Sequence, residues 1–237
     1  QSSIDLASSG DGAVGTTSGP PVEVQWHYEP TGDEFNAYDP DAAVEMLAAA
    51  GYADKDTDGV LMDADGNRLS LRLYARSNSS PEVRACEMIK SYLNAIGVEV
   101  ELTSMDDDAL LDKIYSLDYD LFVWGWSADV DPTVILNILI TDQINNLSDT
   151  YYSNPEYDAL VQLQGTQIDT DARYETVKAA QLLAYNEAPY SVLMYDKGYE
   201  AVNTGEITGL TQTAEGTGPL FFANTNYNYL HAAYAAE

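Results

Sequence analysis

Four side chains suited to contacting a ligand lie close together in the sequence, directly after an apolar run. The run is Leu121–Trp124, and the four residues are Trp126, Ser127, Asp129 and Asp131. The run has the composition of a strand that is buried on both faces. In open α/β sheets, ligands bind where strands end and polar loops begin. The pattern predicts a ligand site at this strand end, although glycine, aspartate and proline also follow strands simply because turns favour them.

Catalysis has little support in these residues. Asp129 and Asp131 would serve a glycosidase only if their carboxyl groups had the separation that such enzymes need. The sequence contains neither a Gly-x-Ser-x-Gly nucleophile motif nor a His-Glu-x-x-His metal motif. Its two histidines, His27 and His231, lie far along the chain from the stretch. We therefore expect a binding protein that is not an enzyme, with no cofactor apart from the metal ion considered next.

A second group of carboxylates has the spacing of a calcium loop. Asp54, Asp56, Asp58 and Asp65 stand at positions 1, 3, 5 and 12, with glycine at position 6. Such loops are normally followed by a helix, whereas residues 67–74 alternate as a strand does. The alternation favours an acidic surface turn, and a calcium-stabilised surface module stays open as the alternative. An unfolding temperature that is unchanged by chelator would remove the calcium alternative.

Composition limits the class of partner. Ten Lys and Arg against 39 Asp and Glu give a formal net charge of −29 over 237 residues. Nucleic acid and anionic membrane surfaces would repel such a chain, so we expect neither as a partner. The acids are spread along the sequence, as in a solvated surface that is adapted to a saline setting. The single cysteine, Cys86, falls within an apolar helical pattern and is expected to be a buried, inert thiol.

The first half of the chain alternates between helical and strand patterns. Asp39 and Pro40 open the first helix as N-cap and first residue, and Gly51 ends it. Further patterns predict a strand over 67–74, a helix over 80–96, a strand over 98–102, a helix over 106–117 and a strand over 121–124. Alternation with short connections is typical of parallel strands joined by helical crossovers. We therefore expect an α/β fold in which a mostly parallel sheet has helices on both faces.

The flanking regions are less regular. Residues 1–21 are rich in serine, glycine and threonine and are expected to form an irregular N-terminal segment. A short strand is expected over 22–26. Later patterns predict a buried helix over 134–140, a helix that Asn154 and Pro155 begin, a long helix over 170–187, a strand over 190–195 and a weaker strand pair over 199–210.

Five segments in this order resemble one family. The sequence is similar to the C-terminal lobe of the oligopeptide/dipeptide/nickel class (family 5) of extracellular solute-binding proteins, which serve ABC transporters. The matching segments are Tyr38–Tyr52, Asp63–Leu73 with its Asp-Gly turn, Trp124–Pro132 (Trp-Gly-Trp-Ser-Ala-Asp-Val-Asp-Pro), Tyr152–Asp158 and Glu187–Tyr190. The resemblance implies a lobe with the type II periplasmic-binding-protein fold over residues 22–210.

The resemblance also implies a function. The chain would be one lobe of the substrate-binding component of an ABC importer, which closes on short peptides and delivers them to a permease in the membrane. Residues 211–237 would return toward an N-terminal lobe that is absent here. Location would be extracellular, at the cell surface or in the periplasm, in a parent that is secreted or lipid-anchored. Oligosaccharide or nickel-chelate binding by the same fold is the alternative, and the 18 tyrosines keep the oligosaccharide open as a ligand.

Roles for individual residues follow from the same resemblance. In peptide-binding members, a Trp-x-x-Asp motif supplies the acid that holds the ligand's α-ammonium group, and that motif falls here on Trp126 and Asp129. Trp126 and Trp124 would form walls of the pocket, with Trp124 the better candidate for the core, and Ser127 would be a weaker ligand contact. We expect Asp131 to cap the next helix. Val123 stands near the place where some oligopeptide binders carry an arginine for the ligand carboxylate.

Overall fold

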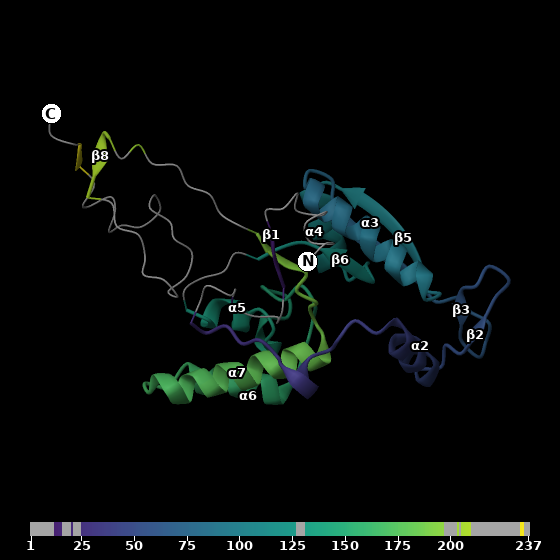
Figure 1. Ribbon diagram of the computed structural model, residues 1–237, viewed down its shortest axis with the longest axis horizontal. Helices are drawn as coiled ribbons and strands as arrows, with labels where there is room; N and C mark the ends of the chain where they lie inside the picture. The colour runs from purple at the N-terminus through teal and green to yellow at the C-terminus, as the bar shows by residue number, and fades with distance from the viewer. Residues whose placement is uncertain are drawn as a thin grey trace. The chain divides into compact units, whose positions relative to one another are not determined.

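The chain divides into two compact units in a computed structural model, and each is described by itself (Figure 1). The structure describes residues 12–15, 20, 25–126, 131–196, 203, 205–209 and 233–234. The first unit comprises Gln1–Gly12 and Thr31–Gly125, and the second comprises Ala13–Pro30 and Trp126–Glu237. The single lobe expected over residues 22–210 therefore spans parts of two units, with a boundary inside the predicted site loop.

A three-stranded parallel sheet forms the centre of the first unit. Its strands are β4 (Ser70–Arg76), β5 (Glu99–Met105) and β6 (Leu121–Val123), in the order β5-β4-β6. Leu73 of β4 is in register with Leu102 on one side and Leu121 on the other. This arrangement confirms the predicted parallel sheet, and its last strand leads directly into the predicted site.

Helix α3 covers one face of this sheet (Figure 1). It spans Ser80–Ala95, and its Cys86 packs with Leu73, Ala75 and Val100, all of which are buried. Burial raises the pKa of the Cys86 thiol to about 12, so the thiol stays protonated at neutral pH. The buried position expected for this cysteine from the sequence is confirmed.

Helix α4, Asp107–Tyr115, packs on the opposite face. Its Leu110 and Ile114 are fully buried against Tyr74, whose neighbours Leu73 and Ala75 point to the other face because strand side chains alternate. Strands β5 and β6 lie on opposite sides of β4, so the two crossover connections run in opposite directions across the sheet. Because both crossovers have the same hand, their helices α3 and α4 lie on opposite faces. The sheet is covered on both faces, as predicted.

The start of the first unit contains a capped helix and a hairpin. Helix α2 spans Pro40–Ala49, and the Asp39 carboxylate accepts a hydrogen bond from the Ala42 N–H at 2.9 Å. Strands β2 (Asp54–Lys55) and β3 (Leu61–Met62) pair antiparallel across the acidic loop. A short 3-10 helix, η1 (Gly32–Glu34), precedes α2. The N-cap and the first-turn proline are as predicted.

Helices dominate the described part of the second unit. α6 (Pro155–Gln164) and α7 (Thr170–Glu187) lie side by side (Figure 1), with α5 (Thr133–Asn137) and the 3-10 helix η2 (Thr141–Gln143) preceding them. α5 is shorter than the helix expected over 134–140, since its β-branched residues lower helix propensity. The buried core comprises Trp26, Leu136, Leu139, Tyr157, Val161, Val177, Ala180 and Ala184.

Strand β1, Gly12–Val14, lies within the segment that we expected to be irregular. It pairs with β7, Met194–Asp196, and the Gly15 N–H donates to the Leu193 carbonyl at 3.0 Å. A Cβ atom on Gly15 would come within 2.2 Å of the Val192 carbonyl oxygen. The small residues of this segment allow the close pairing, and composition alone did not indicate it.

The remaining expectations fall largely outside the described residues. Of the strand expected over 22–26, only Gln25 and Trp26 are described, and they form a turn. Of the regions beyond residue 198, the structure describes strand β8 (Ile207–Thr208), which pairs antiparallel with β9 (Ala233–Tyr234). In the described part of the chain, the helices are too short or too polar to cross a membrane.

Candidate ligand-binding site

Two of the four predicted ligand residues can be placed. Trp124 lies in the first unit and Trp126 in the second, while Ser127 and Asp129 lie outside the described residues. The ligand-contacting roles of all four residues stay predictions.

Trp124 belongs to the core side of the first unit. Its ring contacts the Phe122 ring edge-on, with the ring centroids 6.2 Å apart. It also packs against the buried cluster of Tyr74 with Leu110 and Ile114 of α4. This placement agrees with the expectation that Trp124, rather than Trp126, is a core residue.

Trp126 exposes part of its ring to solvent, while its indole N–H group is hydrogen-bonded within the protein. The side chain is 37% exposed, and the indole N–H donates to a carboxylate oxygen of Asp149 at 3.1 Å and to the Tyr190 hydroxyl at 3.3 Å. The Tyr190 hydroxyl in turn donates to the other carboxylate oxygen of Asp149. Asp149 is only 1% exposed. An anchored, half-exposed aromatic ring of this kind suits the wall of a binding site.

Local backbone geometry brings the two partners to Trp126. Asp149 follows the buried Ser148, whose N–H donates to the Gln143 carbonyl at 2.9 Å and so fixes the turn after η2. Tyr190 comes just after α7, which ends at Ala188 in the left-handed conformation with φ 50°. Pro189 cannot continue the helix. Neither Asp149 nor Tyr190 was predicted as a site residue, because a lone aspartate in a polar segment and a tyrosine after a helix carry no periodic signal.

Asp131 performs the capping role expected of it. Its carboxylate accepts the Thr133 N–H at 2.9 Å at the start of α5, and forms an ion pair with Arg173 at 2.8 Å. Partial burial would raise the pKa of Asp131, but hydrogen bonds from Thr133 and Arg173 hold that pKa below its usual value. The described contacts of Asp131 are thus with Thr133 and Arg173 of the protein itself.

Arg173 of α7 joins several parts of the second unit. Its guanidinium group donates to Gln164 at 2.9 and 2.8 Å and to Thr133 at 3.2 Å, and it lies 4.6 Å from the centre of the Trp26 ring. The side chain is 19% exposed. One partly buried cation therefore fixes the start of α5, the end of α6 and the turn at Trp26 with respect to α7.

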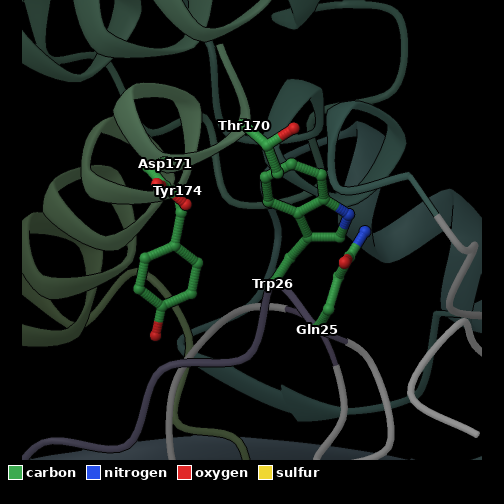
Figure 2. A pocket seen from close by; sticks show the side chains of 5 residues that line it. All are labelled: Gln25, Trp26, Thr170, Asp171 and Tyr174. Atoms are coloured by element: carbon green, nitrogen blue, oxygen red, sulfur yellow. The ribbon is translucent and has the colours of Figure 1, made fainter.

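A small hollow lies beside the first turn of α7 (Figure 2). Gln25, Trp26, Thr170, Asp171 and Tyr174 line it, and its volume is about 170 Å³. Pockets for small-molecule ligands are usually several hundred cubic ångströms. Trp26 is only 6% exposed, so little aromatic surface faces the hollow. We assign it no ligand, and it contains none of the predicted site residues.

The acidic loop uses its central carboxylate to hold its own turn. Asp56 accepts the N–H groups of Val60 and Asp58, each at 2.9 Å, and pairs with Arg68 at 2.9 Å. The backbone hydrogen bond from Val60 contributes most to a lowered pKa of Asp56. Asp58 lies 3.4 Å from the same arginine. These contacts describe a self-supporting acidic turn.

The other two acids of the predicted calcium loop are not part of the hydrogen bonds described for this turn. Asp54 is in β2, and Asp65 donates its N–H to the Asp63 carboxylate at 2.9 Å in the next turn. In the ranges that the structure describes, His, Cys, Asp and Glu side chains form no group of three or more with a metal-holding arrangement. Calcium binding stays a prediction.

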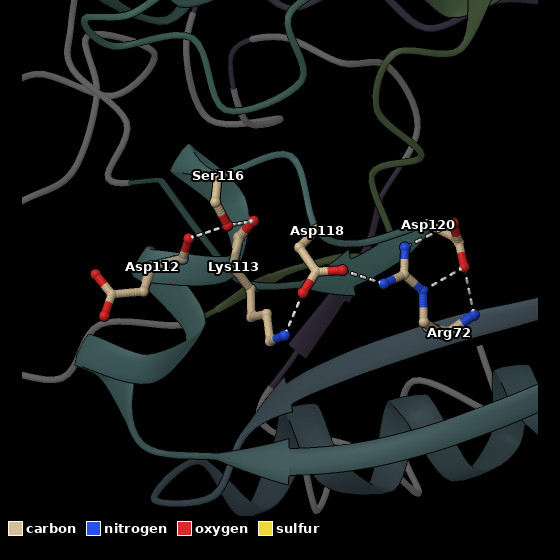
Figure 3. Close-up of polar contacts among 6 residues, drawn as sticks. All are labelled: Arg72, Asp112, Lys113, Ser116, Asp118 and Asp120. Atoms are coloured by element: carbon tan, nitrogen blue, oxygen red, sulfur yellow. Dashed lines mark hydrogen bonds and ion pairs between the residues drawn. The ribbon is translucent and has the colours of Figure 1, made fainter.

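A polar network occupies the edge of the sheet where its strands begin (Figure 3). Arg72 of β4 donates through its backbone N–H and its guanidinium to Asp120, which precedes β6, and it also pairs with Asp118. Lys113 of α4 pairs with Asp118 as well. The hydrogen bond from Arg72 lowers the pKa of Asp120, and that from Lys113 lowers the pKa of Asp118. This edge lies opposite the carboxyl end of β6, so we assign the network to the scaffold.

Comparison with solved structures defines the class of fold. The oligopeptide-binding protein AppA of Bacillus subtilis, solved in complex with a nonapeptide, matches with a TM-score of 0.77 at 22% identity, over 99% of this chain and 45% of that chain. A Thermotoga maritima periplasmic oligopeptide-binding protein bound to mannohexaose matches with a TM-score of 0.73 at 20% identity, over 92% of this chain and 42% of that chain. The fold is that of type II periplasmic binding proteins.

Sequence comparison gives the family. Residues 1–146 match the family model described as "Bacterial extracellular solute-binding proteins, family 5 Middle", and the chain belongs to this family. The sequence of AppA from Bacillus subtilis is 28% identical over 209 residues, which are 85% of this chain and 37% of that protein. The chain thus spans well under half the length of this relative.

Proposed function

We propose that this chain is part of the substrate-binding component of an ABC importer, and that it binds short peptides and delivers them to the permease. The observation that carries the proposal is the family membership over residues 1–146, together with the similarity to AppA, an oligopeptide-binding protein solved with a nonapeptide. Its role is binding without chemistry, outside the cytoplasmic membrane, at the cell surface or in the periplasm. The parent protein would be secreted or lipid-anchored.

The geometry at Trp126 supports a ligand contact at this point of the chain. The ring is held at its polar edge by Asp149 and Tyr190, which leaves part of the apolar surface free to contact a ligand. Asp129 follows three residues later in the sequence and would anchor the peptide α-ammonium group. Loss of one partner from a dehydrated charge pair weakens binding by about 2–5 kcal/mol.

Closure over the ligand needs further protein. The relatives are longer than this chain, which covers 37% of AppA in sequence and 45% of its solved chain. We propose that an N-terminal lobe supplies the opposite wall of an interlobe cleft and that closure is hinge-like. The closed, loaded form would be the one that the permease recognises.

An oligosaccharide is the second candidate ligand. The Thermotoga maritima neighbour is an oligopeptide-binding protein that was solved with mannohexaose, and the exposed ring of Trp126 also suits a sugar face. A nickel chelate is less well supported, because histidine commonly ligates nickel and neither His27 nor His231 lies near the Trp-x-x-Asp motif in the sequence.

Calorimetric titration of the full-length protein that contains this chain with trialanine, N-acetyl-trialanine and mannohexaose tests the proposal. We expect trialanine to bind, and N-acetyl-trialanine to bind at least about 30-fold more weakly because acetylation removes the ammonium charge. The Asp129→Asn variant should lose affinity for trialanine to a similar extent, whereas the control Asp142→Asn, an acid of η2, should not. Binding of mannohexaose alone would overturn the peptide proposal, and equal affinity for both peptides would overturn the assignment of Asp129 as the ammonium anchor.

A further inference from the structure

We infer that Asp149 and Tyr190 are positioning residues, which fix the orientation of the Trp126 indole so that its exposed surface forms one wall of the ligand site. The inference rests on the proposed function, and it assigns roles to two residues outside the Trp-x-x-Asp motif. Neither is inferred to touch the ligand itself.

The three side chains form a closed ring of hydrogen bonds. The indole N–H of Trp126 donates to Asp149 at 3.1 Å and to the Tyr190 hydroxyl at 3.3 Å, and the hydroxyl donates its own hydrogen to Asp149. The Tyr190 hydroxyl thus acts as acceptor for one partner and donor for the other, which fixes its rotation. The indole has one N–H group, and its two acceptors, the Asp149 carboxylate and the Tyr190 hydroxyl, are also hydrogen-bonded to each other.

Burial of Asp149 strengthens the two hydrogen bonds that its carboxylate accepts. Asp149 is 1% exposed, and a buried carboxylate needs hydrogen-bond donors to compensate for the loss of water. Trp126 and Tyr190 supply two such donors from positions 23 and 41 residues away in the sequence. Rotation of the Trp126 side chain away from its place would leave the Asp149 carboxylate short of a donor in a dry environment. The ring is therefore held in one orientation before any ligand arrives.

Prior orientation matters for binding, because a side chain that is already ordered loses less conformational entropy when the ligand binds. In the sequence, Trp126 directly precedes Ser127, and Asp129 follows two residues after Ser127. A fixed indole at this point would give the ligand a constant surface to pack against, whatever the side chains of the peptide are. Removal of the Tyr190 hydroxyl should then affect ligand binding through Trp126 alone.

Nuclear magnetic resonance of the indole N–H groups tests the positioning without any ligand. The three tryptophan resonances are assigned with Trp→Phe variants of the ¹⁵N-labelled chain. Tyr190→Phe should shift the Trp126 indole resonance and speed its exchange with water, and Asp149→Asn should do the same. The control Tyr174→Phe removes a hydroxyl of the same unit, which bonds to the His27 carbonyl at 3.4 Å, and should leave the Trp126 resonance in place. An unmoved Trp126 resonance in both Tyr190→Phe and Asp149→Asn would overturn the inference.

A double-mutant cycle with trialanine tests the consequence for binding. Tyr190→Phe should weaken binding about fivefold, the equivalent of one lost hydrogen bond. In the Trp126→Phe background, which lacks the indole N–H, the same change should weaken binding less than about twofold. Equal weakening in both backgrounds would show that Tyr190 acts by another route and would contradict the inference. If trialanine fails to bind the full-length protein that contains this chain, the proposed function fails, while the resonance experiment still decides whether the indole is held.

Discussion

Replacement of Arg173 by methionine should destabilise the second unit strongly. The arginine holds Gln164, Thr133 and Asp131 by hydrogen bonds and lies over the Trp26 ring. Methionine keeps most of the apolar stem but removes the guanidinium group.

The expected loss can be worked out contact by contact. The Gln164 carbonyl oxygen belongs to a residue that is only 1% exposed, and loss of its two described donors costs about 1–3 kcal/mol. Loss of the cation over Trp26 costs about 0.5–1 kcal/mol. The ion pair with Asp131, whose side chain is 51% exposed, adds about 0.5 kcal/mol. The total is about 3 kcal/mol, or a fall in unfolding temperature of roughly 6–12 °C.

Urea unfolding followed by far-ultraviolet circular dichroism measures this loss. Lys178→Met is a matched control, since Lys178 lies on the same helix and its ammonium group stacks 4.6 Å from the Tyr28 ring. Its removal should cost less than about 1 kcal/mol, because a stacked cation alone contributes no more than that. Equal losses in the two variants would refute the reasoning that buried hydrogen bonds make Arg173 the larger contributor.

Three further predictions concern pH, salt and backbone conformation. The pKa values of Asp118 and Asp120 lie below their ordinary 3.8 in the folded chain, so stabilisation by Arg72 is present above pH 3.8 and lost as the pH falls through the folded values. The difference in unfolding free energy between Arg72→Met and the unmodified chain should therefore shrink below that pH, and a constant difference would contradict it. The net charge of −29 destabilises the folded chain by self-repulsion, and salt screens this repulsion as the screening length falls from about 10 Å at 0.1 M to about 3 Å at 1 M. The urea midpoint of unfolding should therefore rise between about 0.1 and 1 M KCl. A flat or falling midpoint would contradict self-repulsion. Ala188→Gly should raise the unfolding free energy by about 0.5–1 kcal/mol, because φ is 50° at this residue and glycine adopts that conformation without strain. Gly97→Ala should lower the unfolding free energy, because φ is 96° there and the added Cβ would lie 3.0 Å from a carbonyl oxygen. Thermal unfolding of both variants checks that the two changes have opposite signs.

The parallel sheet could be predicted because its signal is local. Leu73 and Ala75 alternate with Tyr74, so the strand between two helical patterns had an apolar residue for each face. Caps behaved in the same way: Asp39 and Asn154 each stand immediately before a proline, and both accept N–H groups of the first turn. Signals of this kind depend on neighbours within a few residues.

The unpredicted features depend on contacts between distant parts of the chain. Strand β1 forms because β7 lies beside it, and nothing in Gly12–Val14 indicates that partner. The same holds at the site. Trp126 was identified from its motif, whereas Asp149 and Tyr190 reach it from 23 and 64 residues away through turns that have no periodicity. Spacing also suggested a calcium loop around Asp56, while the described contacts of that carboxylate are with its own turn and with Arg68.

The central claim is that the natural ligand is a short peptide, and native mass spectrometry tests it most directly. The protein that contains this chain is purified without added ligand, measured intact, and then denatured so that any bound molecule is released and identified. We expect a mixture of short peptides whose masses account for the difference between the native and denatured protein. Release of oligosaccharides or a metal complex in place of peptides would contradict the account.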